Sequence, residues 1–83
     1  MEVRFHPHAR DRMTERGATE DEVTGAVTHG EKFPAKFGRT GFRRNYHFEG
    51  AWRGKPYETK QVEAIAVEEG GGWLVITVMT KYF

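Results

Sequence analysis

The chain has 83 residues and a formal net charge of +1, enough for one small domain, and we expect a single domain over residues 1–83. Its 37% hydrophobic and 13% aromatic content is typical of a folded domain and not of a disordered segment. It contains neither cysteine nor serine, which excludes disulfides, thiolate metal sites and serine or cysteine nucleophiles.

Two helices are predicted in the first third of the chain. The first covers residues 7–16, because proline suits the first helical position and Gly17 suits the left-handed C-terminal position. The second covers residues 20–29, because Thr19 and Glu22 have the spacing of a capping box.

The remaining sequence alternates between apolar and polar residues, which is typical of strands. Pro34 indicates an edge strand, and the apolar run near the C-terminus indicates a central one. We predict an α+β fold, with two N-terminal helices packed on a four-stranded antiparallel sheet. The expected strands cover residues 33–37, 42–48, 59–68 and 73–80, with turns or loops at 38–41, 50–56 and 70–72 and a short strand or lead-in at 3–5.

Positive charge is concentrated in the middle of the chain. Residues 31–60 carry eight lysines and arginines against three glutamates, a local excess of five. Such an excess favours a polyanionic partner such as RNA. The sequence has no apolar run long enough to span a membrane and no signal peptide at its start, so we expect a cytoplasmic protein without a membrane partner.

The first predicted helix carries a chemically distinctive stripe. His8, Arg12 and Arg16 are spaced four residues apart and therefore share one face. An imidazole beside two guanidiniums can bind a phosphate backbone and move a proton. The alternative is structural, because surface charges on helices are common. In that case the arginines pair with nearby carboxylates, namely Glu15, Glu20 or Asp21.

Further candidates lie on the predicted strands. Arg43, Lys60 and Tyr82 are candidates for binding RNA on charge and location alone, and Thr77 adds a hydroxyl group. A metal-independent ribonuclease needs a base for the 2′-hydroxyl, an acid for the leaving oxygen, and cations. Taken singly, Tyr82 is also explained as a core or rim aromatic and Thr77 as a β-former on a strand. The two histidines that flank Pro7 are too few for a metal site, so we expect no metal and no cofactor.

The string His8-Ala9-x-x-Arg12-Met13-x-x-Arg16-Gly17, followed by a capped helix and later by Val75-Ile76-Thr77-Val78, resembles the DUF4258 family of small bacterial and phage proteins. That family is similar to the BrnT and RelE-like ribonuclease toxins. The resemblance implies N-terminal helices on a four-stranded antiparallel sheet, metal-independent RNA cleavage and an antitoxin partner. Residue by residue, it extends to His8, Arg12, Arg16 and Thr77, which are the expected catalytic residues.

Three hypotheses follow. In the first, the protein is a metal-independent endoribonuclease of the toxin–antitoxin type, with His8 as acid or base and the helix arginines as phosphate clamps. In the second, it is a non-catalytic RNA- or protein-binding module. In the third, the arginines only stabilise the helices. A homodimer is compatible with each of them.

Overall fold

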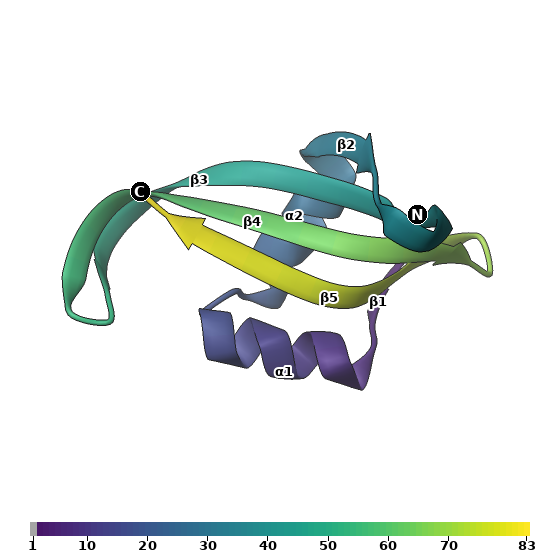
Figure 1. Cartoon of the computed structure of the whole chain (residues 1–83), viewed down its shortest axis with the longest axis horizontal. Helices are drawn as coiled ribbons and strands as arrows, with labels where there is room; N and C mark the ends of the chain where they lie inside the picture. Colours follow the sequence, from purple (N-terminus) through teal and green to yellow (C-terminus); the bar gives the residue numbers. More distant parts are fainter. Residues whose placement is uncertain (1) are drawn as a thin grey trace.

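The computed structural model describes residues 2–83 and shows an α+β domain. Five strands form one sheet in the order β1-β5-β4-β3-β2, and both helices lie on the same side of it (Figure 1). No helix in residues 2–83 is long and apolar enough to cross a membrane. The elements are β1 (Val3–Phe5), α1 (Pro7–Arg16), α2 (Glu20–His29), β2 (Glu31–Pro34), the short 3₁₀ helix η1 (Lys36–Gly38), β3 (Thr40–Trp52), β4 (Lys55–Glu69) and β5 (Gly72–Tyr82).

The α+β class with two N-terminal helices is confirmed, but the predicted four-stranded antiparallel sheet is wrong. The sheet has five strands and is mixed, because β1 pairs in parallel with β5, with Val3 opposite Trp73 and Phe5 opposite Val75. The β1 pairing ends there, with a last bond from His6 N–H to the Val75 carbonyl. Beyond Val75, no strand among residues 2–83 pairs with β5 on that side.

Both helices begin and end where the sequence predicts. In α1, Gly17 takes a left-handed conformation with φ of 72° at the C-terminal end. In α2, the Thr19 hydroxyl accepts from Glu22 N–H, and the Glu22 carboxylate accepts from Thr19 N–H, which completes the capping box.

The core lies between the helices and one face of the sheet. The helix α1 packs against β5, and α2 packs against β3 and β4. Alternate residues of β4 point into this layer, so that Val62, Ala64 and Ala66 are fully buried. The small alanines allow the helices to approach the sheet closely. The opposite face of the sheet has no helix over it (Figure 1).

Two connections differ from the predicted ones. Residues 50–56 do not form a loop, because β3 and β4 continue as an antiparallel arm to a tight turn at Arg53 and Gly54, both with positive φ. The arm curls towards α1, where Trp52 stacks on Tyr82 with ring centroids 4.9 Å apart. The expected edge strand at 33–37 ends at Pro34 and gives way to η1.

Candidate functional site

The predicted helix stripe lies along the part of β5 that β1 leaves unpaired. Arg16 Nη1 donates to the Val78 carbonyl at 2.6 Å. The Arg16 carbonyl in turn accepts from the Thr80 hydroxyl at 3.1 Å and from the Tyr82 hydroxyl at 2.8 Å. Arg16 therefore connects the C-terminal end of α1 to β5 through three hydrogen bonds. Its guanidinium is already bonded to the Val78 carbonyl.

Arg12 follows the structural alternative that the sequence offered. Its Nη1 lies 2.7 Å from Glu15 Oε2, one turn further along the same helix. Because both side chains are partly exposed, such a pair contributes little to stability and is readily exchanged. A phosphate group arriving at this face can therefore compete with Glu15 for the guanidinium.

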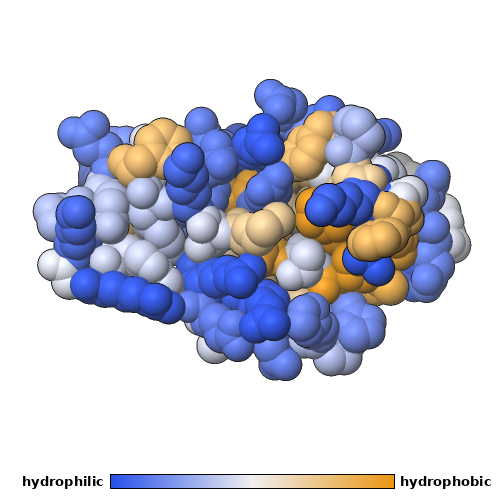
Figure 2. Space-filling view, in the orientation of Figure 1, coloured by the Kyte–Doolittle hydropathy of each residue, from blue (hydrophilic) through white to orange (hydrophobic). Residues whose placement is uncertain are grey.

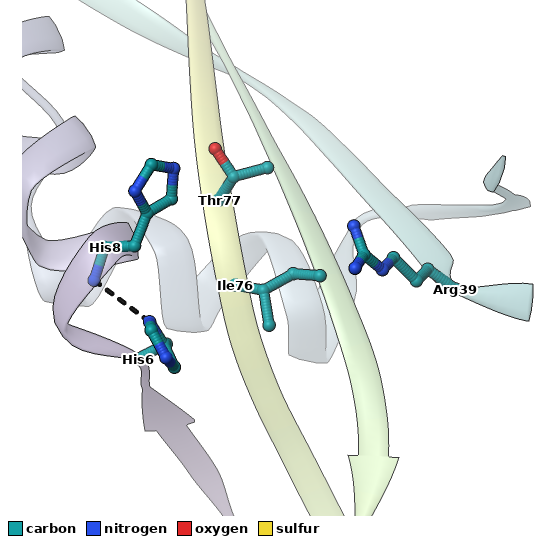
Figure 3. Close-up of a pocket in the computed structure, with 5 residues that line it drawn as sticks. All are labelled: His6, His8, Arg39, Ile76 and Thr77. Atoms are coloured by element: carbon teal, nitrogen blue, oxygen red, sulfur yellow. Dashed lines mark hydrogen bonds between the residues drawn. The ribbon is translucent and has the colours of Figure 1, made fainter. Parts of the chain in front are cut away.

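His8 occupies a different environment at the start of α1. Its exposed ring lines a hollow of about 390 Å³, together with His6, Arg39, Ile76 and Thr77. In Figure 3 the His8 ring and the Thr77 hydroxyl point towards each other across the free side of β5. Arg39 reaches towards the same region from the other side of β4. The structure thus brings together two of the predicted catalytic residues, His8 and Thr77.

His6 is held in a defined state by the helix that it caps. Its Nδ1 accepts from the His8 backbone N–H at 3.1 Å, so this nitrogen carries no proton. The neutral His6 ring therefore has its proton on Nε2, which is free to donate to a ligand. Pro7 occupies the first position of α1, and no acidic residue lies in its first turn, whereas α2 has three acidic residues there. The positive end of the α1 dipole is consequently not neutralised.

The connection between β2 and β3 adds cations to this end of the molecule. Two further hollows adjoin it, of about 430 and 400 Å³, and Arg39 lines both of them as well as the first. Among the described residues, no carboxylate lines any of the three hollows. Lys32, Lys36 and Arg39 also have no carboxylate partner within residues 2–83. The charged residues that line these hollows would all attract a phosphodiester.

The predicted RNA-binding residues lie away from this hollow. Lys60 is only 5% exposed, because its ammonium group points into the helix layer and bonds the Gly17 carbonyl and, at 2.7 Å, the Glu22 carboxylate. It cannot contact an RNA backbone in this position, which corrects the expectation drawn from its charge. Its role is to join β4 to both helices.

Arg43 and Tyr82 are also committed to contacts within the protein. Arg43 lies on the open face of the sheet between Glu31 and Glu63, at 3.2 and 3.1 Å. Tyr82 stacks on Trp52, and its hydroxyl donates a hydrogen bond to the Arg16 backbone carbonyl. Burial is the main cause that raises the pKa of Tyr82 above the ordinary value. Neither side chain lines the hollow at His8.

Sequence reasoning missed His6 and Arg39. His6 was considered only as a metal ligand, although a histidine directly before a proline-initiated helix is at the capping position. Arg39 was placed in a turn, and no local pattern brings it to His8, which lies 31 positions earlier in the sequence. Within residues 2–83, no three histidine, cysteine or carboxylate side chains are grouped as a metal site would require.

Comparisons with known proteins do not assign this chain to a family. No family model matches it, and neither does any curated protein or any solved structure.

Proposed function

We propose that the protein is a metal-independent endoribonuclease with its active site at the hollow between α1 and β5. The observation that carries the proposal is the composition of this hollow: two imidazoles, a hydroxyl and a guanidinium line it, and no carboxylate does. An RNA phosphodiester needs a proton acceptor near its 2′-hydroxyl and positive groups near its phosphate oxygens. Both are present within this one cavity.

In the proposed reaction, His8 accepts the proton of the RNA 2′-hydroxyl, and the 2′-oxygen forms a bond to phosphorus. The bond from phosphorus to the 5′-oxygen breaks, and the leaving oxygen takes a proton from water, which the open hollow admits. The products are a 2′,3′-cyclic phosphate and a 5′-hydroxyl. Arg39 and the Nε2 proton of His6 stabilise the charge that develops on the phosphate oxygens.

The remaining stripe residues support this reaction in different ways. The Thr77 hydroxyl faces the His8 ring, and its proposed role is to orient the ring when RNA binds. Arg12 exchanges Glu15 for a neighbouring phosphate, and Arg16 positions α1 against β5. The proposal agrees with the resemblance to the DUF4258 family and to the BrnT and RelE-like toxins, and it includes a cytoplasmic location and an antitoxin partner.

The test is cleavage of end-labelled single-stranded RNA by the purified protein in EDTA. We expect products ending in a 2′,3′-cyclic phosphate and no cleavage of the same oligonucleotide with 2′-deoxy sugars. His8→Ala should slow cleavage by about 100- to 10,000-fold, as removal of a general base does. The matched control is His29→Ala, because His29 is exposed at the far end of α2 and should be dispensable. Wild-type protein that leaves RNA intact, or equal rates for both variants, would contradict the proposal.

A non-catalytic RNA-binding module is the second candidate. The observation in its favour is that Arg12 and Arg16 both have partners within the protein, which leaves fewer cations for the reaction itself. This candidate predicts RNA binding that weakens with salt and yields no cleavage products.

A further inference from the structure

Phe37 is an exposed aromatic residue at a position with unfavourable backbone geometry. It lies at the tip of the β2–β3 hairpin, 86% exposed, and it is not part of the hydrophobic core. Its φ of 62° and that of Gly38, 71°, place both residues in the left-handed region of a two-residue turn, closed by Arg39 N–H to the Lys36 carbonyl. The first position of such a turn favours asparagine, aspartate or glycine. A phenylalanine here is strained and solvated, and such strained positions are frequent at ligand-binding sites.

The Phe37 ring stands at the edge of the apolar hollow next to the candidate active site. This hollow, of about 400 Å³, is also lined by Pro34, Ala35 and Ile65, and it shares Arg39 and Thr77 with the hollow at His8. The Arg39 guanidinium carbon lies 5.6 Å from the centre of the Phe37 ring. Figure 2 shows an apolar area on this part of the open face, with hydrophilic side chains over and around it.

This arrangement suits an unpaired nucleobase. Proteins bind single-stranded RNA by stacking splayed-out bases on aromatic rings and by contacting the adjoining phosphates with arginine and lysine. Phe37 offers the ring, Ile65 and Ala35 offer an apolar floor, and Lys36 and Arg39 offer positive charge. Carboxylates are missing from the lining residues, so the charge complements a polyanion.

We propose that Phe37 and the hollow beside it bind an unpaired base of single-stranded RNA, next to the nucleotide whose phosphate lies at His8. This inference rests on the proposed ribonuclease function and adds to it a base-binding subsite, in which Arg39 lies between the base and the reacting phosphate. Double-stranded RNA is a poor ligand for this subsite, because its bases are stacked and paired.

The test compares the affinity of Phe37 variants for a short fluorescein-labelled single-stranded 2′-O-methyl RNA, which the proposed reaction cannot cleave, measured by fluorescence anisotropy in EDTA. Phe37→Asn removes the ring and suits the turn, so its urea-unfolding midpoint should equal or exceed that of the wild type. We expect its RNA affinity to fall by about 5- to 150-fold, the range for the loss of one stacked base. Phe37→Trp should retain affinity. Phe83→Asn removes another exposed ring and is the matched control.

Abasic substitutions then locate the base. If one nucleotide stacks on Phe37, removing that base should weaken wild-type binding and leave Phe37→Asn binding unchanged. Cleavage by wild-type protein with equal RNA affinity for Phe37→Asn and Phe83→Asn would overturn the subsite and leave the ribonuclease intact. Phe37-dependent binding without cleavage would support the subsite and overturn the ribonuclease. A Phe37→Asn defect confined to binding a protein partner would overturn the subsite.

Discussion

The covered face of the sheet and the β2–β3 hairpin use their basic residues in opposite ways. On the face covered by helices, two cations bind oxygens of the protein: Lys60 binds Gly17 and Glu22, and Arg44 contacts the Gly25 carbonyl. At the β2–β3 hairpin, by contrast, Lys32, Lys36 and Arg39 have no carboxylate partner among residues 2–83.

This difference shows why a count of charges along the chain is a poor guide to a binding surface. The excess of positive charge in residues 31–60 is divided among the core, the open face and two hairpin tips. Some of these cations stabilise the fold, and others remain available to a ligand. The first of three substitution experiments, arranged from the largest expected effect to the smallest, tests this division, and the other two test how tightly the covered face is packed.

The largest effect is expected at Lys60. Lys60→Met keeps an unbranched chain in the site but leaves the Glu22 carboxylate and the Gly17 carbonyl without their partner. Removing one member of a buried ion pair costs about 3–5 kcal/mol of unfolding free energy. The matched control is Lys36→Met, which should change stability by less than about 0.5 kcal/mol because Lys36 is exposed. Urea unfolding measures both, and equal stabilities would show that the two lysines do not differ in role.

The burial of Lys60 also shows what the sequence allowed and what it did not. Along β4, residues 60, 62, 64 and 66 alternate with more exposed positions, so a period of two places Lys60 on the same face as Val62. The period of two therefore predicts the burial of Lys60, whereas its charge alone predicts an exposed residue that can bind RNA. The helices, in contrast, were predicted almost residue by residue, because capping boxes and C-terminal glycines act within a few residues.

Structural features that depend on pairing between distant segments of the chain are harder to predict from the sequence. The parallel pairing of β1 with β5 joins segments about 70 residues apart, and no local pattern in Val3–Phe5 specifies it. Glycine and proline predict a loop at residues 50–56, whereas the pairing of β3 with β4 extends both strands into this segment. At the site, the stripe on α1 was predictable from its spacing, whereas the approach of Arg39 to His8 follows from the register of the whole sheet.

A second, smaller effect compares two glycines that both have positive φ. At Gly17, φ is 72° and an added Cβ would lie 2.5 Å from the Trp52 ring. At Gly38, φ is 71° and nothing lies within 4 Å. Alanine is strained by about 1–2 kcal/mol in either position, and crowding against Trp52 adds about 1–3 kcal/mol at Gly17 alone.

Gly17→Ala should therefore destabilise the protein more than Gly38→Ala, as measured by thermal unfolding of both variants. The difference between them isolates the packing of the β3–β4 arm on α1, since the backbone strain is common to both. Equal losses of thermal stability in the two variants would mean that the Trp52 ring moves aside without an energetic cost. The covered face would then be less tightly packed here than its contacts indicate.

The smallest expected effect depends on pH and concerns Tyr46 on the covered face. Its hydroxyl donates to the Glu22 carbonyl at 2.6 Å, over Gly25, which has no side chain to block the approach. Burial is the main cause that raises the pKa of Tyr46, and the positive charge of Arg44 partly opposes it. The folded protein therefore holds this proton more tightly than the unfolded chain does.

The sign of the pH dependence follows from this difference. Below about pH 10, the usual tyrosine pKa, the group is protonated in both states and its contribution to stability is complete. As the pH rises from about 10 towards the folded-state pKa, the unfolded chain loses the proton first, and stability falls. Tyr46→Phe lacks this loss, so its urea midpoint should decline less between about pH 8 and about pH 11 than that of the wild type. If the urea midpoints of the wild type and Tyr46→Phe declined in parallel, the Tyr46 hydroxyl would be solvated. The helix layer would then cover the sheet less completely at Tyr46 than at Lys60.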